Sequence, residues 1–484
     1  MDKEFFDGHK WNKGKLITPL NQIEQLSFSS WAKERRPEYL WLSLIIVDFG
    51  HKKGIELCCE VIKELHRLER DVFLPKWSAL IRMDDEKQYA LFKKLFDLKL
   101  EKTIAPLLVL FTYSKAPLFA TVFSNIEINN KEFLGKIKDV LKLTSDHQSE
   151  VSTDTRFCVV YSQFTSGRMR INENLKESFL KLNDYPDLEH TDEAMRMIRP
   201  MIRSLEINDF ESKNTEYIDS FWNMVERMTD CNLFYIEIQE ELIETRCFIE
   251  KVKSVLNYHS DLMLATSPTD LKYTVLLGLA TYAYKRLVEV AEHSLFQSIS
   301  GRGCVRSIVE CCIMMKYLLA NEKNHDNIWE DYQYYGLGQY KLIVERANSA
   351  NADLSKTHVM IDYIDLLVSE FKRKEFIDMD TNYFQKIGVR EKAIQVSEKD
   401  LFDYYYDYDS QFEHALWGAV RESSLLKCDE AGHDYHCVPD LDNNIKLKNV
   451  WFDCCFVIRK IIGILNDEYG CPEHLMVIEG EIDE

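Results

Sequence analysis

Apolar residues recur at intervals of three and four positions through most of this 484-residue chain. That spacing places apolar side chains on one face of an α-helix, so it predicts helices in preference to strands. The chain holds only 17 glycines and 10 prolines, which leaves few sites for tight turns and favours long helices. We therefore predict an all-α fold made of one or more multi-helix bundles. The exception is residues 107–126, where β-branched and aromatic residues mix and a small β element is expected.

Polar and turn-rich segments suggest where the chain divides. Residues 144–155 form a polar stretch, residues 208–214 a weaker seam, and residues 428–444 a loop with many Asp and Asn residues. We expect four parts, namely a mostly helical N-terminal domain, a helical connector, a C-terminal helical bundle, and a last part with a loop, a helix and an acidic tail. Their predicted boundaries are 1–143, 157–210, 214–425 and 426–484. The periodic segment 217–256 forms either one helix or two that separate near residues 229–231.

Charge and cysteine usage limit the partners and the compartment. The formal net charge of −20 argues against non-specific binding to duplex DNA, because phosphate neutralisation supplies most of that affinity. Thirteen cysteines, several in adjacent pairs such as Cys311-Cys312, are typical of small buried apolar residues. No basic and then apolar segment opens the chain, and its longest apolar run is about half of what a membrane span needs. We expect a cytoplasmic protein with no membrane segment and no cofactor, and with a protein partner or a homo-oligomeric state.

Arg306 and Glu310 form the first candidate site. They stand four residues apart on a predicted helix, so their side chains share a face and can pair. The neighbouring residues are apolar almost all round, which predicts burial, and a buried charge needs a partner. The pair is either a structural ion pair or an arginine that faces a cavity and binds a phosphate.

A tyrosine-rich helix that ends at His414 forms the second candidate site. Ser410 precedes His414 by four residues and Asp409 by five, so a hydroxyl or a carboxylate could hold the imidazole ring. Histidine titrates near neutral pH and suits acid–base catalysis, although a hydrogen-bonded core histidine is the alternative. Tyr405 and Tyr408 are candidates for contact with a substrate.

Arg286 and His293 form the third candidate, with six residues between them. Their spacing is about two helical turns, so the side chains share a face. The pattern resembles the Arg-x4-6-His motif of HEPN-type ribonucleases, which implies action on a scissile phosphate, usually across a dimer. Leu287 departs from that motif, which usually has a polar residue there.

Two further clusters are cationic or metal-like. Arg196, Arg199 and Arg203 are predicted on one helix face, where they would meet a phosphodiester, an acidic partner or the chain's own carboxylates. Cys428, His433, His436 and Cys437 are zinc-ligand types in a loop. Their spacing matches no common zinc motif, and His436 and Cys437 are adjacent, so we expect no metal.

Residues from about 271 to 425 resemble an uncharacterised all-helical bacterial domain family that has been compared with HEPN-like bundles. The resemblance is carried by an apolar helix, by Arg306-x3-Glu310, and by a Tyr-rich helix with Ser410-x3-His414. It implies a link to defence-type gene neighbourhoods and brings no activity with it.

Two hypotheses of different classes follow. The first is a bacterial anti-phage effector that acts on RNA or a nucleotide, with His414 as acid or base, Arg306 on the phosphate and Glu310 orienting it. The second is a non-catalytic helical sensor or scaffold that recruits a protein partner. The effector hypothesis is favoured if Arg306, Glu310 and His414 are exposed in a cleft. The scaffold hypothesis is favoured if these side chains are buried in the core and hydrogen-bond with one another.

Overall fold

The computed structural model divides the chain into two compact units, which are described separately. The first unit comprises residues 1–234 and 427–438, and the second comprises residues 235–426 and 439–484. The structure describes residues 8–23, 30–111, 115–127, 129–167, 182–206, 215–239, 243–350, 353–370, 373–433 and 436–475. The expected seam at 208–214 and the acidic end of the chain lie outside these ranges.

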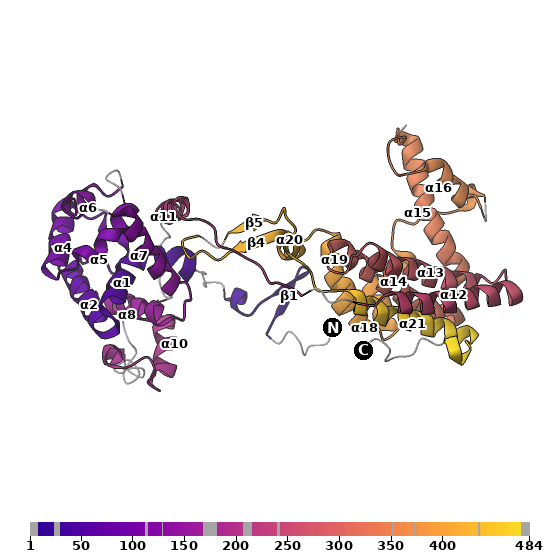
Figure 1. Ribbon diagram of the computed structural model, residues 1–484, viewed down its shortest axis with the longest axis horizontal. Coiled ribbons are helices and arrows are strands. Elements are labelled where there is room, and N and C mark those ends of the chain that lie inside the picture. The colour runs from indigo at the N-terminus through magenta and orange to yellow at the C-terminus, as the bar shows by residue number, and fades with distance from the viewer. Residues whose placement is uncertain are drawn as a thin grey trace. The chain divides into compact units, whose positions relative to one another are not determined.

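The first unit is built on three helices that pack against one another, α1 (Arg36–Phe49), α2 (His51–Leu68) and α8 (Glu150–Thr165) (Figure 1). Helix α1 is buried along most of its length, so it needs neighbours on several sides. The surrounding helices include α4 (Asp85–Asp97), α5 (Glu101–Ile104), α6 (Pro117–Val122), α7 (Asn130–Leu143), α10 (Met195–Glu206) and α11 (Thr215–Arg227).

Gly54 allows α2 to approach α1 closely. A Cβ atom at this position would lie 2.7 Å from the Cα atom of Ile46, which is closer than carbon atoms pack. The contact is with backbone, so no side-chain rotation could relieve it. Gly54 is therefore required by the α1–α2 packing.

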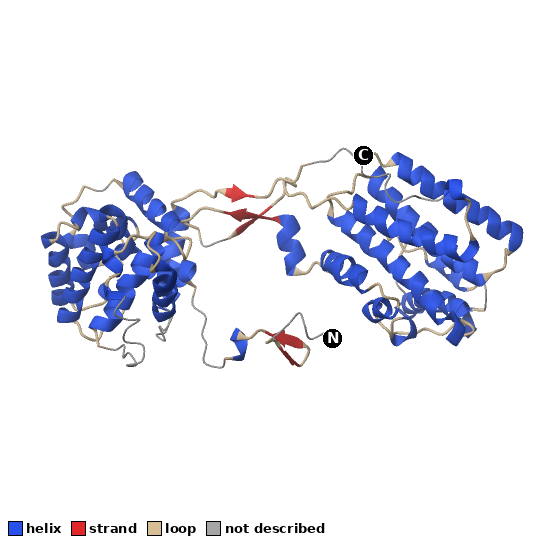
Figure 2. Cartoon of the chain, turned by 90° about the horizontal axis from the view of Figure 1, so that it is seen from below, coloured by secondary structure: helices blue, strands red, loops and turns tan. Residues whose placement is uncertain are grey.

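The second unit is a helical bundle around α14 (Ile299–Asn321) (Figure 2). Helix α14 packs against α13 (Leu271–Glu292) and α21 (Trp451–Tyr469), and α12 (Arg246–Thr266) packs against both of these. Its other sides meet α17 (Val389–Gln395) and the Tyr-rich segment, which consists of a π-helical turn η9 (Phe402–Tyr406) and α19 (Asp407–Glu413). Helices α15 (Ile328–Ala350) and α16 (Ile361–Val368) pair with each other.

Two small sheets complete the described part of the chain. Strands β1 (Lys10–Asn12) and β2 (Lys15–Ile17) form an antiparallel hairpin. Strands β3 (Leu233–Phe234), β4 (Leu425–Cys428) and β5 (Cys437–Pro439) form the other sheet, with β4 in the middle. In the register of β3 and β4, Leu233 faces Cys428.

The predicted fold class is confirmed, since the described residues are mostly helical with small β elements. The position expected for the β element is wrong. Residues 105–109 form a 3-10 helix and Pro117–Val122 form α6, because apolar β-branched residues are as compatible with a buried helix as with a strand.

Two other segments differ from the expectation. The polar stretch 144–155 enters α8 at Glu150, and its small polar residues are buried against α1 and α2. The tyrosine-rich helix expected up to His414 begins as the π-helical turn η9 and continues as α19 to Glu413. Ala415 has a φ of 47°, and α20 (Trp417–Ser424) begins anew after it. The segment 217–256 does separate into α11 and α12, with the break after Arg227.

No helix among the described residues is long and apolar enough to cross a membrane.

We predict opposite effects of alanine at two helical glycines of the first unit. Gly54→Ala forces backbone apart and should lower the free energy of unfolding by about 1–3 kcal/mol. Gly135→Ala in α7 meets no atom within 4 Å and should raise it by about 0.5–1 kcal/mol through helix propensity. Urea unfolding, together with hydrogen exchange of the amides in α1 and α7, measures both changes in the free energy of unfolding. Equal effects at the two sites would contradict the close approach of α1 and α2.

Candidate functional site

A row of polar side chains runs between α14 and the Tyr-rich segment, and we call it the polar seam. On α14, Arg302, Arg306 and Glu310 are spaced by four residues and so lie on one face of the helix. The facing side chains come from Tyr406 at the end of η9 and from α19. The seam members are Arg302, Arg306, Glu310, Tyr406, Asp409, Ser410 and Glu413.

Arg306 is fixed by two hydrogen bonds at the centre of the seam. Its Nε atom donates to Ser410 Oγ at 2.9 Å, and its Nη2 atom donates to Tyr406 OH at 2.8 Å. The guanidinium carbon lies 4.6 Å from the centre of the Tyr406 ring, and Glu310 Oε2 is 3.9 Å from Nη2. Nη1 makes no hydrogen bond to a described residue, and the side chain is 25% exposed. The structure thus holds the arginine in place while one of its nitrogens remains available.

Two tyrosines flank Glu310 and Arg306: Tyr383 donates to Glu310, and Tyr406 accepts from Arg306. Tyr383 OH donates to Glu310 Oε1 at 2.6 Å. Burial, followed by the charge of Glu310, raises the pKa of Tyr383, and the same causes raise the pKa of Tyr406. Both phenols therefore keep their protons at neutral pH and can donate hydrogen bonds. Neither tyrosine is among the site residues predicted from the sequence.

Asp409 adds a carboxyl group that titrates near neutral pH. Its pKa is raised to about 7, mainly by burial; the nearby charge of Arg302 opposes this rise, and the like charges of Asp453 and Glu413 add to it. Its Oδ1 atom lies 4.0 Å from Arg302 Nε, and neither atom has a hydrogen-bond partner among the described residues. Arg302 instead donates from Nη2 to the Lys448 carbonyl at 2.9 Å. A buried carboxyl with a pKa near 7 can take up and release a proton near neutral pH.

His414 lies at the solvent-exposed end of α19. It caps the helix, and its N–H donates to the Ser410 carbonyl at 3.1 Å, one turn away from the residue that holds Arg306. The structure brings Arg306 to Ser410, although the two are about a hundred residues apart in sequence. Glu310 belongs to the same seam. No described contact joins the His414 side chain to Arg306 or Glu310.

The other predicted residues of the second unit lie around the seam. Tyr408 OH donates to Glu422 Oε1 at 2.6 Å, and Tyr405 is half-buried against the bundle core. Arg286 pairs with Glu289 at 2.6 Å on α13, close to the point where the Glu413 side chain covers Gly303. His293 is exposed just after α13 ends.

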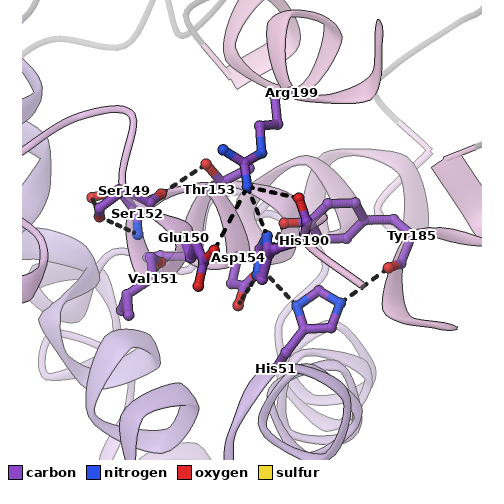
Figure 3. Close-up of polar contacts among 11 residues, drawn as sticks. His51, Ser149, Glu150, Val151, Ser152, Thr153, Asp154, Tyr185, His190 and Arg199 are labelled. Carbon is purple, nitrogen blue, oxygen red and sulfur yellow. Dashed lines mark hydrogen bonds and ion pairs between the residues drawn. The ribbon is translucent and has the colours of Figure 1, made fainter. Parts of the chain in front are cut away.

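A second polar network lies inside the first unit, centred on Asp154 of α8 (Figure 3). Tyr185 OH donates to Asp154 Oδ1 at 2.5 Å, and His51 Nδ1 donates to the same oxygen at 2.8 Å. His190 Nε2 is 3.4 Å from Oδ2, and Arg199 Nη2 donates to His190 Nδ1 at 3.2 Å. Arg199 therefore points toward this network, whereas Arg196 is exposed and Arg203 is half-buried. The three arginines do not form one open cationic face.

The hydrogen bonds define the charge state of this network. His51 Nε2 faces the Tyr185 carbonyl at 3.1 Å and must carry a proton, and Nδ1 donates to Asp154. Burial lowers the pKa of His51, but the hydrogen bond and charge of Asp154 outweigh burial and raise it overall. For Asp154, burial raises the pKa, and its three donors outweigh that and lower it. Since both His51 nitrogens carry protons, the group His51, Asp154 and His190 is an ion-pair network and not a set of free metal ligands.

The cysteines and histidines of the last loop also come together. Cys428, His433 and His436 lie in one group, and its fourth member is Cys231, which lies between α11 and β3. Cys437 is not part of it. Cys231 is not predicted from the sequence because it lies about 200 residues before the others.

Residues 275–433 match a family that is described only as a family of unknown function (DUF5677). The match covers about a third of the chain, from α13 to the loop that carries His433, and it includes every element of the polar seam. The expected similarity to an uncharacterised family is confirmed at this level. No curated protein and no solved structure matches the chain.

We predict that the stability of the first unit depends on pH through His51. Because its folded pKa is raised above 6.5, the His51–Asp154 pair stabilises the fold below pH 6.5, and this contribution is lost as the pH rises through the folded pKa. His51→Gln should flatten the decline in melting temperature between pH 6 and pH 8.5. The control His147→Gln changes an exposed histidine and should leave the decline unchanged. An unaltered slope in His51→Gln would contradict the assigned charge state.

Asp409→Asn should stabilise the second unit, and more at high pH than at low pH. Between the unfolded pKa of 3.8 and the folded value of about 7, the folded state holds a proton that the unfolded chain releases, so stability falls as pH rises. We expect a gain of roughly 2–4 kcal/mol at pH 8 that shrinks by at least half at pH 5.

Thermal unfolding at pH 5 and pH 8, together with hydrogen exchange of the amides in α19, measures the gain in stability. The control is Asp407→Asn, which changes an exposed carboxylate on the same helix. The same gain at pH 5 and pH 8 would show that Asp409 is ionised throughout this range.

Proposed function

We propose that the chain is an effector that acts on RNA or a nucleotide, and that the polar seam of the second unit binds the phosphate. The observation that carries the proposal is Arg306, which Ser410 and Tyr406 hold in place and whose Nη1 nitrogen makes no hydrogen bond to a described residue. A fixed guanidinium with available donors suits a phosphate oxygen, because it can bind without reorganising. The setting in bacterial anti-phage defence is part of the proposal and comes from the family resemblance described above.

The proposed roles follow the positions along the seam. Arg306 would neutralise charge on the phosphate, and Glu310, held by Tyr383, would keep the guanidinium oriented. His414 is exposed one turn beyond Ser410 and would serve as the acid or base. Trp417 and Tyr404 are 71% and 69% exposed and could stack on bases. The class of reaction, hydrolysis of a phosphodiester or nucleotide, is proposed from the resemblance of the Arg286 and His293 spacing to the motif of HEPN-type ribonucleases.

The experiment uses full-length Arg306→Gln and His414→Asn chains. Both residues reach solvent, so we expect each variant to melt close to the parent and to lose at least tenfold in cleavage of single-stranded RNA or in growth toxicity. Arg246→Gln is the matched control, since Arg246 is an exposed arginine of the same unit that pairs only with Glu250 of its own helix. Parent-like activity in both seam variants would overturn the proposal. A large loss of melting temperature in both would assign the seam to core stability.

The second candidate function, recruitment of a protein partner, is favoured by one observation. Large apolar side chains are exposed on and after α16, including Leu366 at 65% and Phe376 at 68%. Such exposed apolar groups are typical of an interaction surface. If Leu366→Glu removed the phenotype while the Arg306 and His414 variants kept it, the function would belong to this surface and the chain would act as a scaffold.

A further inference from the structure

Four metal-ligand side chains of the first unit converge at one point. Cys231 follows α11, Cys428 ends β4, and His433 and His436 lie in the loop between β4 and β5. Their ligand atoms, the two Sγ atoms, His433 Nδ1 and His436 Nε2, all lie within 4.8 Å of one another. Cys428 and His433 are buried, His436 is half-buried, and Cys231 is exposed, so the point is close to solvent.

The distances have the size that tetrahedral zinc requires. Sulfur–nitrogen separations are 3.2 Å for Cys231 and His436, 3.3 Å for Cys428 and His433, and 3.6 Å for Cys231 and His433. The two ring nitrogens are 3.3 Å apart. Bonds of about 2.3 Å to sulfur and about 2.0–2.1 Å to nitrogen at tetrahedral angles give separations of about 3.6 Å and about 3.3 Å.

The proton on His433 is located by its outer neighbours. His433 Nε2 lies 2.8 Å from Thr229 Oγ1 and 3.2 Å from the Thr229 carbonyl oxygen. The carbonyl can only accept, and the Thr229 hydroxyl already donates to the Val225 carbonyl at 2.9 Å. Nε2 therefore carries the proton, and Nδ1 directs a lone pair at the two sulfurs and His436. Metal-bound histidines are oriented in this way by a hydrogen bond from the other ring nitrogen.

We propose that Cys231, Cys428, His433 and His436 bind one zinc ion. Two thiolates and two neutral imidazoles are a tetrahedral zinc donor set, and the thiolates neutralise the charge of the ion. All four positions are filled by protein, so the site is structural and leaves no open position for a substrate. Cys437, the first residue of β5, is excluded because its sulfur is not among the converging ligand atoms.

The site joins two segments that are far apart in sequence. Residues 427–438 return to the first unit at the end of the family-matched region, which extends to residue 433. The backbone on both sides of the site is paired, with Asp429 N–H donating to the Asn232 carbonyl at 2.7 Å and Cys428 N–H to the His436 carbonyl at 3.1 Å. The zinc ion would tie this returning segment to the end of α11.

The test measures zinc in the full-length chain after exchange into metal-free buffer and then after addition of zinc. We expect about one zinc per chain, with X-ray absorption that shows two sulfur neighbours at about 2.3 Å and two nitrogen neighbours at about 2.0–2.1 Å. A chain that retains no zinc after either treatment overturns the proposal, and so does a Cys231–Cys428 disulfide in a zinc-free chain.

Three variants separate the proposed ligands from their neighbours. Cys231→Ser changes an exposed residue, which should leave folding of the helices intact, and it should abolish stoichiometric zinc binding, as should His436→Asn. Cys437→Ser is the matched control and should keep the zinc and both sulfur neighbours. Retention of zinc by Cys231→Ser, or its loss from Cys437→Ser alone, would show that the ligand set is a different one. Since the measurement does not depend on activity, its outcome is independent of the proposed effector function.

Discussion

Each charged side chain on a helix that is buried on nearly every side needs a partner from a neighbouring element. In the second unit, α14 is such a helix. Its apolar residues pack against α13, α21 and α17, which leaves one face for Arg302, Arg306 and Glu310. The Tyr-rich segment supplies the hydrogen-bond partners of Arg306, whereas Tyr383 donates to Glu310 and the Lys448 carbonyl accepts from Arg302. A π-helical turn directly before α19 brings Tyr406 and Ser410, four residues apart, to the same guanidinium, and such turns recur at functional sites. The candidate site is thus a consequence of how α14 is covered.

The same rule shapes the first unit with different residues. Glu206 of α10 is buried between Arg35 and Arg156, and the guanidinium of Arg156 lies 4.3 Å from the centre of the Trp31 ring. Asp154 likewise collects three donors. In both units the buried charges sit where helices distant in sequence meet, so they favour one arrangement of helices over other equally apolar ones. The two networks differ at their centres, because the Asp154 side chain is 3% exposed whereas the Arg306 side chain is 25% exposed.

The sequence predicted what depends on local spacing. Helical periodicity predicted the all-α class, and the four-residue spacing of Arg306 and Glu310 identified one face of the seam on α14. Arg302 stands one turn earlier and was accessible to the same argument. Residues 107–126 were mistaken for strands because short apolar runs look alike in both states. Asp409 was noticed only as a neighbour of His414, since its raised pKa comes from tertiary burial. Cys231 was missed because no local pattern connects it to a loop about 200 residues later.

The returning segment 427–438 shows why a cross-link is needed at that point. Strands β3, β4 and β5 have two, four and three residues, and both residues of β3 are exposed, so this sheet buries little apolar surface. Small sheets with little burial are marginal on their own. Metal binding supplies free energy that does not depend on apolar area, because the site exists only when the distant segments meet. A zinc ion held by Cys231 on one segment and by three residues on the other would therefore account for how so short a sheet keeps its register.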